Sequence, residues 1–125
     1  MLADSTAVAT VAVKDLETAR RFYGDTLGLS SINEQQDEVV VYRSGNSSLN
    51  VYRSQFAGTN KATAVTWSVG DAFESIIADL KRKNVRFERY DLPGARMDGD
   101  VHVFGDFRVV WFKDPDGNIL SLVNR

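Results

Sequence analysis

Ser121 lies in the stretch KDPDGNILSLVN near the C-terminal end of the sequence. A serine hydroxyl needs a neighbouring base to act as a nucleophile, and no motif pairs Ser121 with a histidine or carboxylate. The chain has one histidine, His102, and no cysteine, which excludes disulfides, thiolate metal sites and cysteine nucleophiles. A calcium loop starting at Asp114 would need Gly and Glu where Ile119 and Arg125 stand. The DPDG residues are instead typical of a type I turn.

The composition is that of an ordinary globular chain of one-domain size. It has 125 residues, of which 43% are hydrophobic and 26% charged, enough to build a core. The formal net charge of −2 argues against nucleic acid or an anionic membrane as a partner. No apolar run approaches the roughly 20 residues that span a bilayer. The start, MLADSTAVATVAV, lacks the basic region of a signal peptide, so we expect a cytoplasmic protein.

The first half of the chain predicts a strand, a helix and three further strands. Residues 7–13 alternate and are rich in Val and Thr, and Asp15 follows where a helix N-cap should stand. The segment LETARRFYGDTLGL then has an apolar face at helical spacing, and Gly28 would end the helix. That face comprises Leu16, Ala19, Tyr23 and Leu27. The three strands are expected at residues 30–35, 38–43 and 48–53, the last two joined by a turn at Gly45-Asn46.

The second half repeats this order. A strand is expected at residues 63–69, then Asp71 as N-cap, with Glu74 completing a capping box. The helix AFESIIADLKRKN has an apolar face of Phe73, Ile76, Ile77 and Leu80. Further strands are expected at residues 86–90, 107–113 and 119–123. The glycine-rich stretch 91–106 reads as a loop and a candidate lid, with room for one extra strand at residues 100–104.

Two pairs of matching segments indicate a duplication. VAVKDLETA corresponds to WSVGDAFES, and GNSSLNVYR corresponds to GNILSLVNR. A duplicated βαβββ unit explains both pairs, so the sequence predicts an α+β fold made of two such modules.

The segments VAVKDLETARRFYGDTLGL and VVWFKDPDGNILSLV resemble the vicinal oxygen chelate superfamily, which includes glyoxalase I, bleomycin-resistance proteins and extradiol dioxygenases. The resemblance covers essentially the whole chain. It implies one domain of two βαβββ modules, about residues 5–55 and 61–125. Their curved mixed sheets would surround a cleft, with one helix per module outside. Many members are homodimers, so the resemblance implies a homodimer here.

The superfamily's metal enzymes hold a divalent cation with four side chains, typically His, Glu or Gln, His and Glu. Carried over one at a time, these positions fall on Val8, Asn50, Ala64 and Ser121. Val and Ala have no ligating atom, while Asn and Ser offer only neutral oxygens, a weak set for a transition metal. A shift of one residue in either direction supplies no His or carboxylate. We therefore expect no metal and no other cofactor.

Strand alternation extends the predicted cleft lining beyond these four positions. The candidate lining residues are Val8, Thr10, Asn50, Tyr52, Ala64, Thr66, Ser121 and Val123. Arg43, Trp67, Trp111, Phe107 and His102 are further candidates whose faces the sequence does not fix. Such a small, mixed polar and aromatic lining suits a small organic molecule.

These observations favour a metal-independent small-molecule-binding protein that resembles bleomycin-resistance and glyoxalase-like proteins and sequesters its ligand in the cleft. The alternative is a divergent metal-dependent lyase, isomerase or dioxygenase, so whether the protein is an enzyme stays open. Such an enzyme would need other ligands, for example His102 with Glu38, Asp98, Asp100 or Asp106. A third class is a structural or regulatory domain whose cleft has collapsed. The acidic balance slightly favours a neutral or cationic ligand over an anionic one.

Overall fold

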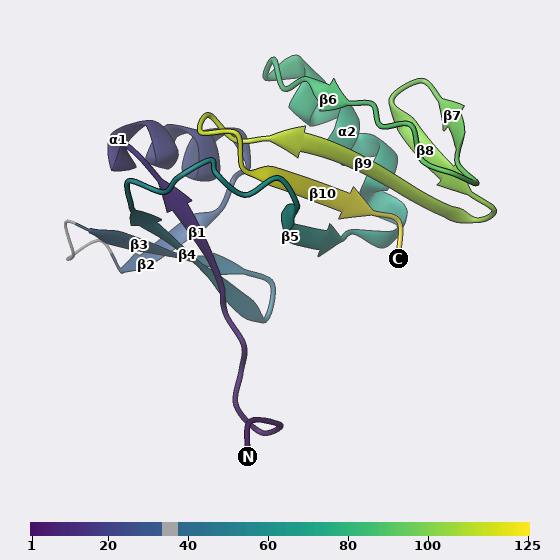
Figure 1. The fold of residues 1–125 in the computed structure, drawn as a ribbon. Helices are drawn as coiled ribbons and strands as arrows, with labels where there is room; N and C mark the ends of the chain where they lie inside the picture. Colours follow the sequence, from purple (N-terminus) through teal and green to yellow (C-terminus); the bar gives the residue numbers. More distant parts are fainter. Residues whose placement is uncertain (34–37) are drawn as a thin grey trace. The chain divides into compact units, whose positions relative to one another are not determined.

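The computed structural model describes residues 1–33 and 38–125 and divides them into two compact units. Unit 1 comprises Met1–Asn60 together with Pro115–Asn118, and unit 2 comprises Lys61–Asp114 and Ile119–Arg125. Each unit contains a mixed sheet and a helix, so the α+β class and the duplication are confirmed (Figure 1). The turn Pro115–Asn118 belongs to unit 1, although the predicted second module included it.

Unit 1 has the predicted βαβββ order. Its elements are β1 (Ala9–Val13), α1 (Leu16–Ala19), η1 (Arg20–Thr26), β2 (Ser30–Asn33), β3 (Val39–Ser44) and β4 (Ser47–Arg53). The strand order is β1-β4-β3-β2, with β1 parallel to β4 and the other pairs antiparallel. Part of the strand expected at residues 30–35 lies outside the described residues.

The helix of unit 1 begins where the sequence predicts. The Asp15 carboxylate accepts hydrogen bonds from the backbone N–H groups of Glu17 and Thr18 at 3.2 and 3.3 Å, as an N-cap should. After one α-helical turn, the chain widens into the π-helix η1, in which Leu27 N–H donates to Phe22 O, five residues back. The buried helical residues are Leu16, Ala19 and Tyr23, whereas Leu27 remains partly exposed.

The sheet of unit 1 has two different faces. Val11, Val13, Leu49 and Val51 are almost completely buried and alternate with more exposed residues along β1 and β4. Helix α1 lies against β4, so the buried set faces the helix. On the opposite face, Thr10 of β1 lies beside Asn50 of β4. We call this the helix-free face of unit 1.

Unit 2 carries more strands than a βαβββ module. It contains β5 (Thr63–Ser68), η2 (Gly70–Ala72), α2 (Phe73–Arg82), β6 (Phe87–Glu88), β7 (Arg96–Asp98), β8 (Val101–Phe104), β9 (Phe107–Lys113) and β10 (Ile119–Val123). The strand order is β5-β10-β9-β8-β7, with β6 paired to β9. The predicted bounds of β9 and β10 are confirmed, while the strand expected at residues 86–90 is reduced to two residues.

Stretch 91–106, expected as a loop and candidate lid with room for one strand, contains two short strands. Arg96–Asp98 and Val101–Phe104 form an antiparallel hairpin that joins the edge of the sheet through β9. The optional strand at residues 100–104 corresponds to β8. The sequence missed β7 because its three residues are all exposed and show no alternation that a strand on a core would require.

The prediction of Asp71 as an N-cap was wrong. Asp71 lies inside the 3₁₀ turn η2, and Ala72 occupies the cap position of α2 without a side-chain hydrogen bond. Glu74 does not close a capping box, since its carboxylate accepts a 3.0 Å hydrogen bond from Arg108. The predicted apolar face holds for Phe73, Ile77 and Leu80, while Ile76 is only half-buried.

Side-chain pairs place α2 against one face of the unit 2 sheet. Besides the pair between Arg108 of β9 and Glu74, Lys81 lies 5.8 Å from the Phe87 ring centre. Phe87 packs edge-on against Phe112, so Phe112 and its alternate neighbour Val110 face the helix. Trp111 therefore points to the other side, which we call the helix-free face of unit 2.

The turn Pro115–Asn118 is fixed to the end of β1. Asn118 Nδ2 donates to Ala12 O at 2.7 Å, and Lys14 N–H donates to Asp116 Oδ1 at 3.3 Å. Gly58 approaches the same turn so closely that a Cβ atom there would lie 2.1 Å from Asp116 O. The DPDGN stretch therefore does more than reverse the chain, because its side chains anchor the segment that leads into β10.

Candidate functional site

Ser121 lies on the helix-free face of unit 2, in the centre of the sheet. It stands on β10, opposite Thr66 of the parallel neighbour β5 and opposite Trp111 of the antiparallel neighbour β9. Its Oγ atom is 2.6 Å from Thr66 Oγ1, so one hydroxyl donates a hydrogen bond to the other. Ser121 is only 2% exposed. Its hydroxyl is thus bound to a neutral partner and not to a histidine or carboxylate that would activate it.

A β-bulge changes which residue of β5 joins this face. Ile119 pairs with Thr63 and Leu120 with Val65, so Ala64 is the extra residue between two ladder positions. Thr63 and Thr66 consequently share the face of Ser121. The Trp111 indole N–H donates to Thr63 Oγ1 at 3.0 Å, which fixes the ring beside the hydroxyl pair. The resemblance to the superfamily had selected Ala64 for this place, and a bulge leaves no signal in the sequence.

Two aromatic rings, those of Tyr90 and His102, pack against Trp111. The Trp111 and Tyr90 ring centres are 5.3 Å apart, and those of Trp111 and His102 are 4.9 Å apart, both in edge-on geometry. His102 is fully buried on β8, the strand that was optional in the sequence prediction. Its Nε2 atom accepts the backbone N–H of Tyr90 at 2.9 Å. No sequence pattern had selected Tyr90 as a member of this group.

The predicted lining residues fall into two sets. In unit 2, Thr66, Ser121 and Val123 lie together, with Val123 opposite Ser68 and Val109 and only 8% exposed. In unit 1, Thr10 and Asn50 are paired neighbours, and Tyr52 pairs with Ala12 on the same strands. Val8 directly precedes β1 and is exposed. Each set is defined within its own unit, so the eight residues remain a predicted lining.

The ionisable residues near the unit 2 face have identifiable partners. Burial raises the pKa of the Tyr90 phenol, the Glu88 charge raises it further, and Lys113 opposes this. Glu88 and Lys113 themselves form an ion pair at 3.3 Å, so their charges largely cancel. On Asp100, the hydrogen bond from Arg89 lowers the carboxyl pKa, and Lys81 adds to this effect against the opposing effect of burial.

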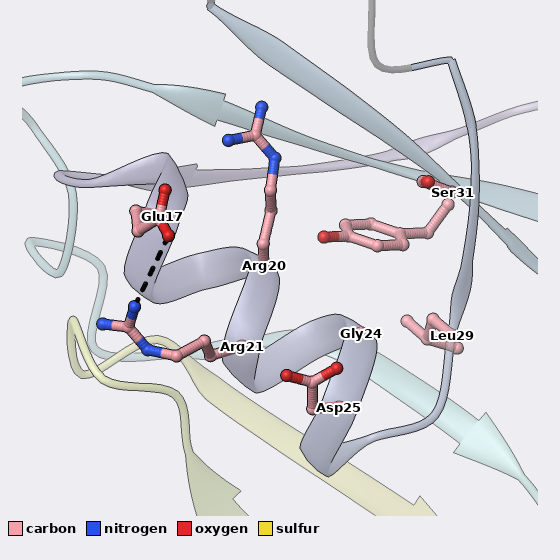
Figure 2. Close-up of a pocket in the computed structure, with 8 residues that line it drawn as sticks. Glu17, Arg20, Arg21, Gly24, Asp25, Leu29 and Ser31 are labelled. Atoms are coloured by element: carbon pink, nitrogen blue, oxygen red, sulfur yellow. Dashed lines mark ion pairs between the residues drawn. The ribbon is translucent and has the colours of Figure 1, made fainter.

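A depression lies beside the helix of unit 1. It has a volume of about 320 Å³, and Figure 2 shows the side chains around it. Glu17 and Arg21 form an ion pair across one side at 3.7 Å, whereas Arg20 leaves the helix in another direction. The other lining residues are Gly24, Asp25, Leu29, Ser31 and Tyr42. Its mixed charges and open shape offer no catalytic group, and no lining residue predicted from the sequence belongs to it.

The family model described as the Glyoxalase/Bleomycin resistance protein/Dioxygenase superfamily matches residues 5–122. The chain belongs to this superfamily. No curated protein matches the sequence. The superfamily fold agrees with the two mixed sheets and with the order of their elements.

Solved structures of superfamily proteins share this fold at low sequence identity. A glyoxalase family protein from Enterococcus faecalis aligns with a TM-score of 0.72 and 21% identity, covering 98% of this chain and 99% of its own. Fosfomycin resistance protein FosX from Mesorhizobium loti gives 0.70 and 12%, covering 100% and 94%. The oxidase ChaP-H2 gives 0.69 and 22%, covering 98% and 94%. At such identities the likeness establishes the fold alone.

The residues at the superfamily's metal positions do not fit a divalent cation. Val8 and Ala64 have no donor atom, and the Ser121 hydroxyl is engaged by Thr66. Within residues 1–33 and 38–125, no three His, Cys, Asp or Glu side chains gather as a metal site. Of the four carboxylates named as substitutes, three have basic partners: Asp98 pairs with Arg108, Asp100 with Lys81 and Arg89, and Glu38 with Arg53.

No helix in the described part of the chain has the length and apolar content to cross a membrane.

Proposed function

We propose that this superfamily member binds a small organic molecule without a metal and sequesters it by non-covalent contacts. The observation that carries the proposal is the neutral hydroxyl pair of Thr66 and Ser121, 2.6 Å apart, at a position where the superfamily's metal enzymes hold a carboxylate. Two hydroxyls that bond one another retain one hydrogen and several lone pairs for a ligand. They therefore suit hydrogen bonding to an uncharged group and not coordination of a cation.

The surroundings of the hydroxyl pair support an organic ligand. Trp111 supplies a large apolar surface beside Ser121, and its own N–H is already bonded to Thr63. The nearest opposite charges, Glu88 and Lys113, neutralise one another. An apolar wall with a few oriented polar groups is the usual composition of a small-molecule site. A neutral ligand fits these groups best, and a cationic one agrees with the net charge of −2.

We further propose that the protein forms a homodimer, with the helix-free face of unit 1 contributing to the association. Val8 and Tyr52 on this side are each 38% exposed, and Ile32 of β2 is 52% exposed. Exposed apolar side chains of this size are common on surfaces that other molecules cover. Light scattering of the purified protein, compared with an Ile32→Glu variant, tests the association. A monomeric wild-type protein would exclude it.

A fragment screen by two-dimensional NMR tests ligand binding. The fragments are neutral, cationic and anionic compounds, each measured in the presence of a chelator. The expected result is that neutral or cationic fragments shift the backbone signals of Thr66, Ser121 and Trp111. A Thr66→Tyr variant should lose this binding, because the large ring fills the exposed side of the hydroxyl pair.

An Ala78→Tyr variant provides the matched control, because Ala78 is exposed in the middle of α2 and the same ring there cannot reach the helix-free face. Fragments that bind equally to both variants, or that bind only after a metal is added, would contradict the proposal. The cytoplasmic location remains a prediction from the sequence that cell fractionation would test.

A further inference from the structure

Two of the three rings beside the hydroxyl pair are held by hydrogen bonds at their polar atoms. The Trp111 indole has a single donor, which Thr63 Oγ1 accepts at 3.0 Å. His102 Nε2 accepts the Tyr90 backbone N–H at 2.9 Å. Because a backbone N–H always carries its hydrogen, Nε2 must be the unprotonated nitrogen of the neutral ring. These bonds fix the Trp111 ring and the Tyr90 backbone before any ligand arrives.

The Tyr90 hydroxyl takes no part in these hydrogen bonds. Within the described residues, Tyr90 Oη and His102 Nδ1 are the buried side-chain atoms without a hydrogen-bond partner. A buried polar group without a hydrogen-bond partner destabilises the fold, so folded proteins rarely leave one without a reason. The carbonyl oxygen of Tyr90 lies 3.2 Å from His102 Nε2, but neither of these two acceptors can donate to the other.

We propose that Tyr90 Oη is the hydrogen-bond donor that recognises an uncharged acceptor oxygen, such as a carbonyl, of a planar aromatic ligand packed against Trp111. This inference rests on the proposed small-molecule binding and specifies the ligand class and the residue that selects it. An uncharged acceptor fits this place best, because the Glu88–Lys113 pair leaves little net charge nearby to balance an anion. The phenol, whose pKa is raised by burial, offers it a neutral hydrogen bond.

The geometry also explains how the buried hydroxyl becomes available. The phenol makes no hydrogen bond within the described residues, so turning its ring toward a ligand breaks none. The Tyr90 backbone meanwhile remains bound to His102. A planar aromatic ligand gains contact with the Trp111 ring, and aromatic pairs of this kind stabilise a complex beyond the effect of the apolar area they bury. His102 is accordingly a positioning residue and not a ligand of the bound molecule.

Two probes of nearly identical shape isolate the hydrogen bond. Acetophenone carries a carbonyl oxygen where α-methylstyrene carries a CH₂ group. Wild-type protein should bind acetophenone about two- to tenfold more tightly, the factor expected for one net hydrogen bond. Both probes should shift the Trp111 indole N–H signal in two-dimensional NMR, with the two tryptophan signals assigned through a Trp67→Phe variant.

A Tyr90→Phe variant removes only the hydroxyl. It should bind both probes equally, and its affinity for α-methylstyrene should match that of the wild type. Tyr23→Phe is the matched control, because Tyr23 is a buried tyrosine of unit 1 and should leave the preference intact. The inference is overturned if wild type shows no preference, if the preference survives in Tyr90→Phe, or if neither probe shifts the Trp111 signal.

These outcomes are distinguishable from failure of the proposed function. If fragments shift the NMR signals of Thr66 and Ser121 but never that of Trp111, the proposal of small-molecule binding stands and the proposed role of Tyr90 is excluded. If no fragment binds at all, both proposals are excluded.

Discussion

Replacing Gly58 by alanine should destabilise the protein more than its backbone angle alone explains. Gly58 has a φ of +75°, and the added Cβ would lie 2.1 Å from the backbone oxygen of Asp116. Left-handed backbone in a residue with a Cβ costs roughly 1–2 kcal/mol. Relieving such a contact requires the turn to move by more than 1 Å, and overpacking of this kind costs about 1–3 kcal/mol more. We therefore expect Gly58→Ala to cost about 2–5 kcal/mol.

Gly28→Ala is the matched control for this prediction. Its φ of +76° is nearly the same, but its Cβ would meet nothing within 4 Å. This variant should lose only the conformational part, roughly 1–2 kcal/mol. Urea denaturation of the two variants and the wild type, followed by tryptophan fluorescence, gives the free energies of unfolding. The difference between the variants measures the contact alone.

Equal free energies of unfolding for the two alanine variants would refute the reasoning. That result would mean that the turn Pro115–Asn118 does not press against Gly58.

Three further predictions concern single residues. Asp15→Ala should lower the denaturation midpoint while Asp71→Ala leaves it unchanged, because only Asp15 accepts hydrogen bonds from the start of a helix; equal effects would contradict the assignment. In the Asp100→Asn variant, the free energy of unfolding should fall less steeply than in the wild type as the pH is lowered. The folded-state pKa of Asp100 is lowered below 3.8, chiefly by Arg89, so its stabilisation is complete above that pH and is lost as the pH falls through the lower folded value; identical acid profiles would argue against the ion pairs. Nitrogen-15 NMR of the sole histidine, His102, in its neutral form should show the Nδ1–H tautomer, and an Nε2–H tautomer would exclude the bond from Tyr90.

The sequence predicted those elements best whose local signals are unambiguous. Strands β9 and β10 are apolar runs bounded by turn residues, and their bounds were right to the residue. Asp15 combines an N-cap residue with a following apolar helical face, and it caps α1. Asp71 has the same local pattern, but the chain enters α2 through a 3₁₀ turn, which is decided by the path from β5 and not by Asp71.

The candidate site was only partly predictable for a related reason. The resemblance selected Ser121 and Ala64, and strand alternation from Ala64 added Thr66, which lies opposite Ser121. Alternation carries no sign of the bulge at Ala64, because one extra residue in a strand interrupts the regular pairing. The contribution of Tyr90 depends on β8 bringing His102 under its backbone, a contact between segments that no local pattern records.

The most direct test of the central claim is a calorimetric titration of the purified, chelator-treated protein with Mn²⁺, Ni²⁺, Zn²⁺ and Fe²⁺, accompanied by elemental analysis of the untreated protein. Metal-independent binding predicts no stoichiometric metal in the purified protein and no tight binding of any of the four ions. One tightly bound ion per chain would contradict the account, and it would require ligands other than Val8, Asn50, Ala64 and Ser121.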